Sequence, residues 1–314
     1  MRYFTYSQYL NQKYGERVYK LPVNLPGTCP NRDGCVGVGG CIYCGEEGAA
    51  FENLPSTMPV AEQIQRNMEY IGKKYKAEKF IVYFQNYSNT YMPLNEFKKY
   101  IEQAVAKNVV EIAISTRPDC ISDEYLDYLF EFKERNRIEI SIELGLQSVN
   151  YHTLKTINRG HTLAEFIDAV LRIKKRGFPV CAHLILNLPW DDMTDVVECA
   201  KIVSALQIDQ VKLHCLYILK DTPIADMYLN NEFEMGSFYD YVEKVIAFIE
   251  HLHPDIAIQR IIGRAREEDC IFANYGTSWW KIKDNIDAQL DLFDSHQGIK
   301  CDYLNGKALK KFEK

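Results

Sequence analysis

The sequence lacks long hydrophobic runs and an excess of basic charge. Its longest apolar stretch, Ala182 to Trp190, is interrupted by His183 and Asn187, whereas a membrane-spanning helix needs about 18 or more consecutive apolar residues. The 43 acidic residues outnumber the 37 lysines and arginines and give a net charge of −6, so bulk electrostatics does not favour nucleic-acid binding. The first ten residues lack the apolar core and cleavage site of a signal peptide, and we therefore expect a cytoplasmic protein.

The chain also lacks low-complexity linkers, and its composition is that of a globular protein. Of its 314 residues, 47% are hydrophobic and 25% are charged, whereas disorder would require far less apolar content and collagen far more glycine and proline. This length allows one large α/β domain or two smaller domains.

Cysteine is plentiful, with ten residues in the chain. Because cytosolic thiols stay reduced, we expect metal binding, catalysis or packing rather than disulfides. Four of them, Cys29, Cys35, Cys41 and Cys44, fall within one glycine-rich stretch, which lets the backbone wrap closely around a bound group. The other six are scattered and are interpreted as core residues or inert thiols: Cys120, Cys181, Cys199, Cys215, Cys270 and Cys301.

Short β-branched runs alternate with longer amphipathic segments from residue 18 onward. The predicted strands are residues 18–25, 79–85, 109–116, 138–147, 179–188 and 208–218. The predicted helices between them are residues 60–75, 94–107, 122–135, 162–175 and 191–206. A further helix at 238–251 and a strand at 256–262 follow. Nearly continuous apolar strands, each followed by a crossover helix, indicate a parallel sheet buried on both faces.

Six strand–helix units are too few for a complete eight-stranded barrel. The periodicity therefore leaves a doubly wound open sheet and an incomplete barrel as alternatives, and both place function at the carboxyl ends of the strands. Polar residues gather at these predicted ends: Gln85, Asn86, Arg117, Gln147, Asn187 and His214. We expect a core of residues 1–220 and a C-terminal α/β extension of residues 221–314.

The spacing Cys29-x11-Cys41-x2-Cys44 places three thiols on one loop after the first predicted strand. Four cysteines including Cys35 would complete a tetrahedral zinc site, although such sites usually pair two short C-x2-4-C knuckles. Three thiolates suit an iron–sulfur cluster with one iron open to a ligand, and Tyr43 is placed to cover it. The spacing favours the cluster and leaves zinc, or no metal at all, as the alternatives.

Several motifs resemble the radical S-adenosylmethionine (SAM) enzymes, specifically the bacterial YhcC/YtqA-like subfamily with its widened cluster loop. They are CPNRDG at 29–34, GGCIYC at 39–44, YFQNYSNTY at 83–91, STRPD at 115–119, ELGLQS at 143–148, NRGH at 158–161, KLH at 212–214 and QG at 297–298. The segments 143–148 and 158–161 are also similar to the radical SAM domain of the Elongator catalytic subunit. The resemblance covers nearly the whole chain and implies an incomplete (β/α)6 radical SAM barrel.

This resemblance implies that Cys29, Cys41 and Cys44 hold a 4Fe–4S cluster whose open iron binds SAM. The subfamily's loop does not require a cysteine at position 35, so Cys35 is expected to be extra. An electron from a donor such as flavodoxin or ferredoxin would start the reductive cleavage of SAM. The resulting 5′-deoxyadenosyl radical would then abstract hydrogen from a substrate.

The remaining candidates are polar residues that would contact SAM. Arg159 offers the planar two-donor fork that suits the SAM carboxylate, and Gln147 would satisfy its buried amide on a ribose hydroxyl. The family's Gly-Gly-Glu after the second strand is absent here, so Gln85 or Asn86 is expected to accept from the SAM amino group.

Three further polar residues lie within apolar strands. The Glu143 side chain lies on the same face of its predicted strand as Gly145 and Gln147, because side chains alternate along a strand. It would either contact SAM or pair with Lys212. His183 and His214 are cavity candidates, with satisfied core histidines as the alternative interpretation.

The subfamily and Elongator resemblance implies tRNA as substrate, with the 5-substituent of the wobble uridine, a carboxymethylaminomethyl-type group, as the predicted target. Basic clusters within residues 73–79, 172–176, 260–266 and 307–314 would let an acidic protein hold a structured RNA through a few phosphates. The alternatives are a radical SAM enzyme for a small molecule and a zinc-stabilised RNA-binding protein without catalysis.

Overall fold

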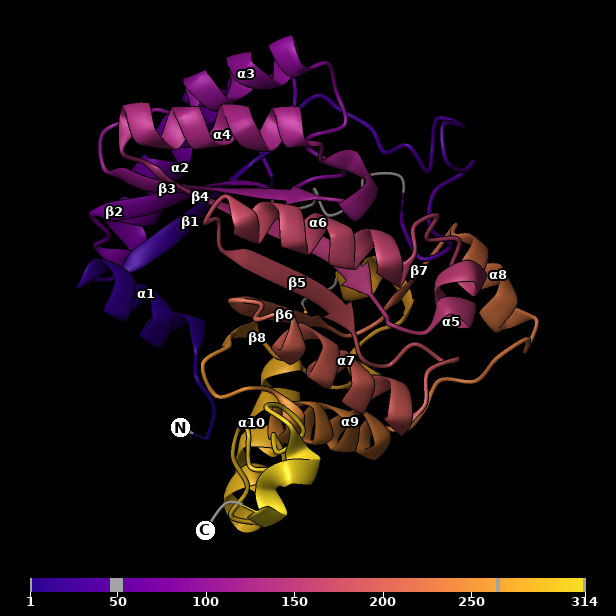
Figure 1. Ribbon diagram of the computed structural model, residues 1–314. Coiled ribbons are helices and arrows are strands. Elements are labelled where there is room, and N and C mark those ends of the chain that lie inside the picture. The colour runs from indigo at the N-terminus through magenta and orange to yellow at the C-terminus, as the bar shows by residue number, and fades with distance from the viewer. Residues whose placement is uncertain (1, 46–52, 264–265, 313–314) are drawn as a thin grey trace. The chain divides into compact units, whose positions relative to one another are not determined.

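The computed structural model describes residues 2–45, 53–263 and 266–312, which form two compact units (Figure 1). The cysteine-loop unit contains residues 7–146 and 158–181, and the C-terminal unit contains residues up to 6, 147–157 and from 182 onward. The expected division between residues 220 and 221 stays a prediction.

The strands form a seven-stranded sheet in the order β1-β2-β3-β4-β5-β6-β8. The cysteine-loop unit supplies the parallel strands β1 (Val18–Val23), β2 (Lys79–Phe84), β3 (Val109–Thr116) and nearly all of β4 (Glu139–Gln147). Strand β5 (Val180–Ile185) is divided between the two units, and β6 (Gln210–His214) pairs in parallel with β8 (Ala257–Arg260) in the C-terminal unit. The predicted parallel α/β sheet is confirmed, with β8 as its seventh strand.

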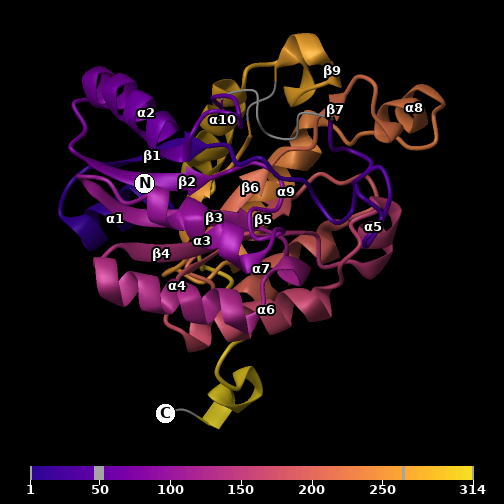
Figure 2. The same ribbon diagram turned by 90° about the horizontal axis from the view of Figure 1, so that it is seen from above.

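Helices follow the strands as the periodicity predicts. The helices of the cysteine-loop unit are α1 (Tyr6–Tyr14), α2 (Val60–Tyr75), α3 (Leu94–Gln103), α4 (Asp123–Asn136) and α6 (Leu163–Lys175). Those of the C-terminal unit are α5 (Tyr151–Thr156), α7 (Met193–Ala205), α8 (Pro223–Leu229), α9 (Phe238–His251) and α10 (Trp279–Leu292). Figures 1 and 2 show α2, α3 and α4 together along the first strands. A short antiparallel pair, β7 (Ile218–Leu219) with β9 (Cys270–Phe272), lies in the C-terminal unit and was not predicted.

Most predicted strands end earlier than expected because their last polar residues enter loops. Strand β5 ends at Ile185 instead of residue 188, and Asn187 beyond it accepts a hydrogen bond from the Leu216 N–H at 2.6 Å. Helix α3 likewise ends at Gln103 instead of residue 107, because the chain must turn before β3. Four of the polar side chains predicted at the carboxyl ends of the strands are therefore carried by loops, namely Gln85, Asn86, Arg117 and Asn187, whereas Gln147 and His214 are the last residues of β4 and β6.

A buried charge network joins α1 to β3 and β4. Glu111 is 1% exposed and accepts hydrogen bonds from Lys13 Nζ at 2.9 Å, Tyr14 Oη at 2.5 Å and Ser141 Oγ at 2.6 Å. Burial alone would raise the pKa of Glu111, but Lys13 and the two hydroxyls outweigh it and lower the pKa below its usual range. The carboxylate is therefore ionised, and its donors hold α1 against the strands.

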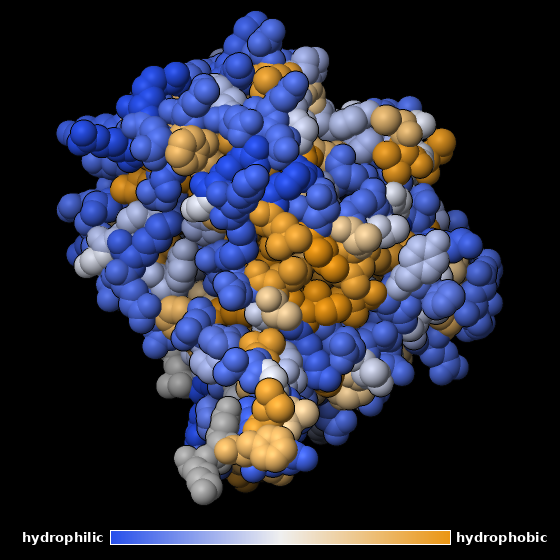
Figure 3. Space-filling model, in the orientation of Figure 1, coloured by the Kyte–Doolittle hydropathy of each residue, from blue (hydrophilic) through white to orange (hydrophobic). Residues whose placement is uncertain are grey.

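The surface seen in Figure 3 is mainly hydrophilic, with hydrophobic residues gathered near its middle. Single exposed apolar side chains such as Leu171 are normal on a folded protein. No helix within the described ranges is both long and apolar enough to cross a membrane.

Candidate active site

Three of the clustered cysteines lie on the loop that follows β1, and we call Cys29, Cys41 and Cys44 the cysteine triad. Cys41 is buried, whereas Cys29 and Cys44 are partly exposed. The loop is wound tightly, since the Cys44 N–H donates to the Cys41 carbonyl at 2.9 Å and the Arg32 N–H to the Cys29 carbonyl at 2.8 Å. This winding presents three sulfurs from one short segment, as a metal site requires.

Each thiol of the triad faces the guanidinium of a different arginine. The nitrogen–sulfur distances are 3.9 Å for Arg117 Nη1 to Cys29, 3.6 Å for Arg159 Nη1 to Cys41 and 3.2 Å for Arg32 Nη2 to Cys44. Burial raises the pKa of the Cys44 thiol, and Arg32 offsets this only in part because negative charge on the other two thiols opposes ionisation. Positive charge from a bound iron cluster would favour the thiolate form of Cys44 beyond what Arg32 provides.

The fourth cysteine of the loop has a different environment. Cys35 is exposed, and its backbone N–H donates to Asp33 Oδ1 at 3.1 Å. Its thiol contacts Tyr91, whose pKa is raised mainly by that hydrogen bond. This position is consistent with the expectation that Cys35 is extra.

Asn31 packs between two glycines beside the triad. A Cβ added to Gly37 would lie 2.3 Å from Asn31 Oδ1, and one added to Gly160 would lie 2.7 Å from it, so neither position has room for a side chain. Asn31 Nδ2 donates to the Asn158 carbonyl and approaches Cys41 Sγ at 3.7 Å. Asn31 Oδ1 is buried and has no hydrogen-bond partner in the described part of the chain. An orphaned acceptor beside the sulfurs fits a bound group that supplies a donor.

Arg159 is buried directly behind Cys41. Its Nη2 donates to the Gly145 carbonyl at 2.8 Å, and its Nε donates to His161 Nε2 at 2.8 Å. Burial, with help from the Arg159 and Arg117 charges, lowers the pKa of His161 to about 3. His161 is therefore neutral, and its Nε2 acts as the acceptor. A two-bond contact from Arg159 to a SAM carboxylate would use the guanidinium N–H groups that these hydrogen bonds do not occupy.

Three other residues that are predicted to contact SAM lie in the cysteine-loop unit: Tyr43, Gln85 and Asn86. The phenol of Tyr43 lies beside Cys41, and burial raises its pKa well above the usual range. Gln85 and Asn86 follow β2, which pairs with the strand preceding the triad loop. The Gln85 N–H donates to the Val23 carbonyl at 3.2 Å, and Asn86 Oδ1 accepts from the Tyr87 N–H at 3.1 Å. Whether these side chains bind SAM stays a prediction.

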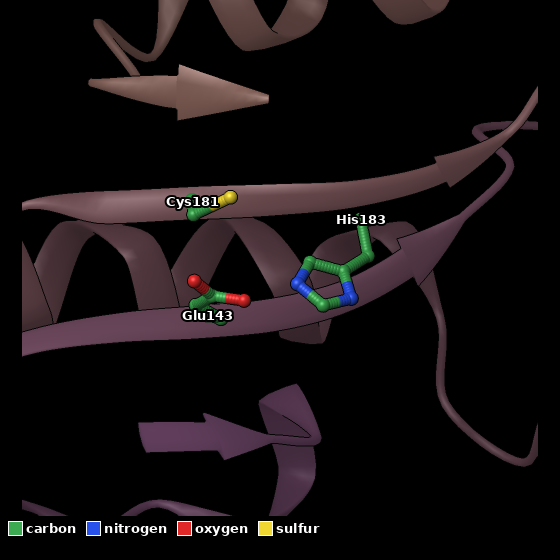
Figure 4. Close-up of side chains that lie close together, drawn as sticks. All are labelled: Glu143, Cys181 and His183. Atoms are coloured by element: carbon green, nitrogen blue, oxygen red, sulfur yellow. The ribbon is translucent and has the colours of Figure 1, made fainter. Parts of the chain in front are cut away.

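Glu143 is 1% exposed on β4 and forms an ion pair with Lys20 of β1. Lys20 Nζ also lies 4.5 Å from the centroid of the Tyr83 ring on β2. Figure 4 shows Glu143 beside Cys181 of β5, and the ligand atoms of these two side chains lie within 4.8 Å. An ion pair of Glu143 with Lys20 is therefore observed, and the predicted roles of Glu143, contact with SAM or pairing with Lys212, stay predictions.

The other predicted residues belong to the C-terminal unit. Gln147 ends β4 with a φ of +76°, a left-handed conformation that costs a non-glycine residue about 1 kcal/mol or more. His183 and His214 lie with their ring centroids 5.2 Å apart. Backbone strain at a polar residue is frequent at binding sites, which supports keeping Gln147 as a candidate.

Sequence reasoning missed the residues that surround the sulfurs. Three of them lie inside the motifs given above without a predicted role: Asn31, Arg32 and His161. A fourth, Arg117, is predicted only as a polar residue that follows a strand. The available signal was the position of three arginines inside the motifs 29–34, 115–119 and 158–161. Their pairing with individual thiols depends on the fold and is not readable from spacing.

Comparison with known proteins identifies the class. The radical SAM superfamily model matches residues 25–203, and a radical SAM C-terminal domain model matches residues 208–291. The first match covers more than half of the chain, and the chain therefore belongs to the radical SAM superfamily, whose members use a 4Fe–4S cluster and SAM. The protein is a radical SAM enzyme.

The similar proteins support the predicted subfamily. Uncharacterized protein YtqA of Bacillus subtilis is 34% identical over 298 residues, which are 95% of this chain and 92% of that protein. Elp3 of the archaeon Methanocaldococcus infernus has a TM-score of 0.70 at 16% identity, covering 95% of this chain and 68% of that chain. A protein of the same archaeon named tRNA uridine(34) acetyltransferase is 25% identical over 164 residues, 51% of this chain and 29% of that protein. The predicted incomplete radical SAM barrel and the subfamily resemblance are both confirmed.

Proposed function

We propose that the cysteine triad holds the 4Fe–4S cluster and that Cys35 takes no part. The observation that carries this proposal is the pairing of each triad thiol with its own guanidinium. Cys35 is exposed and lies against Tyr91. Once bound, the cluster and SAM supply the radical that abstracts hydrogen from the substrate.

The surrounding residues shape this site in distinct ways. Hydrogen bonds from the arginines to the cysteine sulfurs stabilise negative charge there, and such bonds tune the potential of a cluster. Arg117 is itself held by Asp119, with Nη2 2.7 Å from Oδ2. Asn158 donates to the Gly40 carbonyl at 2.8 Å and ties the triad loop to the NRGH segment. Arg159, the next residue of this segment, is the proposed partner of the SAM carboxylate.

The proposed substrate is tRNA. The enzyme would remove or remodel the 5-substituent of the wobble uridine, which is a carboxymethylaminomethyl-type group. The names Elp3 and tRNA uridine(34) acetyltransferase of similar proteins support a tRNA uridine substrate. A flavodoxin or ferredoxin is the proposed electron donor. An unstacked anticodon loop suits this chemistry, because its bases can be turned out into a cavity.

The four basic clusters that are predicted to contact phosphate differ in their ion pairs and in their exposure. Arg172 and Arg176 of α6 are engaged by Asp168, Asp123 and Asp127, so that cluster is largely neutralised. The basic end of α2 is more available, since its lysines are exposed: Lys73, Lys74 and Lys76. Arg264 and Lys314 of the other two clusters lie outside the described residues. We therefore place the main phosphate contact of the cysteine-loop unit at the end of α2.

Mass spectrometry of nucleosides in total tRNA tests the proposed function. A deletion strain should show a changed wobble uridine, restored by the wild-type chain and by Cys35→Ala but not by Cys41→Ala. An unchanged nucleoside profile would favour a small-molecule substrate instead. Anaerobic reconstitution separates the metal alternatives, because only an iron–sulfur cluster gives a brown protein that dithionite bleaches.

A further inference from the structure

The widened part of the loop that carries the cysteine triad forms an exposed turn, and we call residues 33–38 the loop knuckle. Its first and last residues, Asp33 and Val38, form a β-bridge, and the Val36 N–H donates to the Pro30 carbonyl at 2.8 Å. Val38 is 79% exposed and Val36 is 45% exposed. A hydrogen-bonded turn therefore presents two apolar side chains to solvent within the triad loop.

A hollow of about 570 Å³ lies beside the loop knuckle, at the carboxyl ends of β2 and β3. Its lining comes from the loops that follow these strands and from the start of α4: residues 90–93, residues 119–122 and Tyr125. Tyr91 on this lining contacts Cys35 and Asp33 of the loop knuckle through its hydroxyl. The knuckle and the hollow therefore form one continuous surface of the cysteine-loop unit.

Two polar contacts connect this surface to the cysteine triad. Asp119 lines the hollow and accepts a hydrogen bond from Arg117 Nε at 2.8 Å. Arg117 is buried, and its Nη1 lies 3.9 Å from Cys29 Sγ. One side chain thus separates the wall of the hollow from a proposed cluster ligand. Because electron transfer between proteins slows steeply with distance, a redox partner on this surface would be well placed to reduce the cluster.

The charges of this surface favour a protein partner over RNA. Neither the loop knuckle nor the lining of the hollow contains a lysine or an arginine, and their charged side chains are the carboxylates of Asp33 and Asp119. RNA binding depends on basic side chains that neutralise phosphates. Transient electron-transfer complexes, by contrast, use small interfaces, and the two exposed valines beside a hollow suit a small apolar contact.

We propose that the loop knuckle and the adjacent hollow form the docking site of the protein that reduces the cluster. The inference rests on the proposed function, in which a flavodoxin or ferredoxin is the electron donor, and it adds the surface that this donor contacts. In the docked complex the reduced donor loses one electron and the cluster gains it, and no covalent bond forms or breaks. Val36 and Val38 pack against the donor, and the hollow receives an edge of it.

The rate of SAM cleavage by the reconstituted full-length protein, measured with protein and chemical reductants, tests the proposal. Reduced flavodoxin or ferredoxin must dock, whereas dithionite is a small anion that needs no docking surface. Val38→Glu places a charge in the apolar contact and should lower cleavage driven by a subsaturating protein donor about tenfold or more. Ser122→Trp fills the hollow from a side chain that makes no capping hydrogen bond, and it should have the same effect. Cleavage driven by dithionite should stay at the wild-type rate in both variants.

A matched control separates docking from a general effect of surface charge. Leu171 is likewise exposed, at 59%, but it lies on α6 and belongs to neither the loop knuckle nor the lining of the hollow. Leu171→Glu should leave the rates with all reductants unchanged. Iron content and melting temperature should match the wild type in all three variants, because each replaced side chain is exposed.

A wild-type rate with the protein donor in Val38→Glu would overturn the docking site, and a wild-type rate in Ser122→Trp alone would remove the hollow from it. An equal loss in Leu171→Glu, or a loss with dithionite as well, would also overturn it, since the change would then act on charge in general or on the cluster itself. Weaker tRNA binding with unchanged donor-driven cleavage would assign the surface to RNA. A wild type that cleaves no SAM with any reductant would instead refute the proposed cluster function.

Discussion

Replacement of Lys13 by methionine should expose how strongly the buried Glu111 depends on one cation. The Glu111 side chain is 2% exposed and that of Lys13 is 22% exposed, so the pair is largely shielded from water. In Lys13→Met the carboxylate keeps only the Tyr14 and Ser141 hydroxyls, and burial then drives it to take up a proton. Neutralising a carboxyl of ordinary pKa 4.5 at pH 7 costs about 3.4 kcal/mol, which sets the scale of the loss.

We therefore expect Lys13→Met to lower the free energy of unfolding by about 3 kcal/mol at neutral pH. For 314 residues, with an unfolding entropy of about 2.1 cal/mol/K per residue, this corresponds to a melting temperature about 4–5 °C lower. The loss should shrink as the pH falls. In the wild type, the lowered pKa of Glu111 means that its stabilisation is present above pH 4.5 and is lost as the pH falls through the folded-state pKa. In the variant that pKa is raised, so the buried carboxyl destabilises the fold at neutral pH, and this destabilisation is relieved as the pH falls.

Thermal unfolding of the apo-protein at pH 7.5 and pH 5.0 measures this effect. The difference between wild type and Lys13→Met should fall to about 1 °C at pH 5.0, and Lys13→Met/Glu111→Gln should unfold near the wild type at both values. Lys79→Met is the matched control, because its pair with Glu16 is exposed at 36% and 41% and should contribute little. An equal loss at both pH values would show that Lys13 stabilises through packing and would refute the electrostatic reasoning.

Three further predictions concern the candidate site. Alanine at any member of the cysteine triad should abolish iron binding and SAM cleavage, whereas Cys35→Ala should keep both; iron and sulfide analysis decides, and iron loss in Cys35→Ala would overturn the ligand assignment. Arg159→Ala should retain iron but weaken SAM binding roughly 10- to 100-fold in equilibrium dialysis, and an unchanged affinity would remove Arg159 from the SAM site. Gly160→Ala should lower iron occupancy, because its Cβ would meet Asn31 at 2.7 Å and its φ is +78°. Gly177→Ala, with φ +72° but open space around it, should keep full occupancy, and similar losses in both would indicate a general folding defect.

Much of the architecture follows from local patterns in the chain. The helices α2 and α9 begin and end where the amphipathic pattern predicts, because a 3.6-residue period is recorded in the sequence itself. The cysteine spacing and the motifs around it likewise identify the radical SAM loop. Strand ends are less predictable, since residues such as Asn187 leave the sheet to bond with a segment far along the chain.

What only the tertiary structure decides is the partner of each charged group. Glu143 pairs with Lys20, 123 residues away, and each thiol of the triad meets an arginine from a different place in the motifs. Periodicity and spacing are local properties of the chain, whereas the partner of a charge depends on which strands and loops the fold brings together.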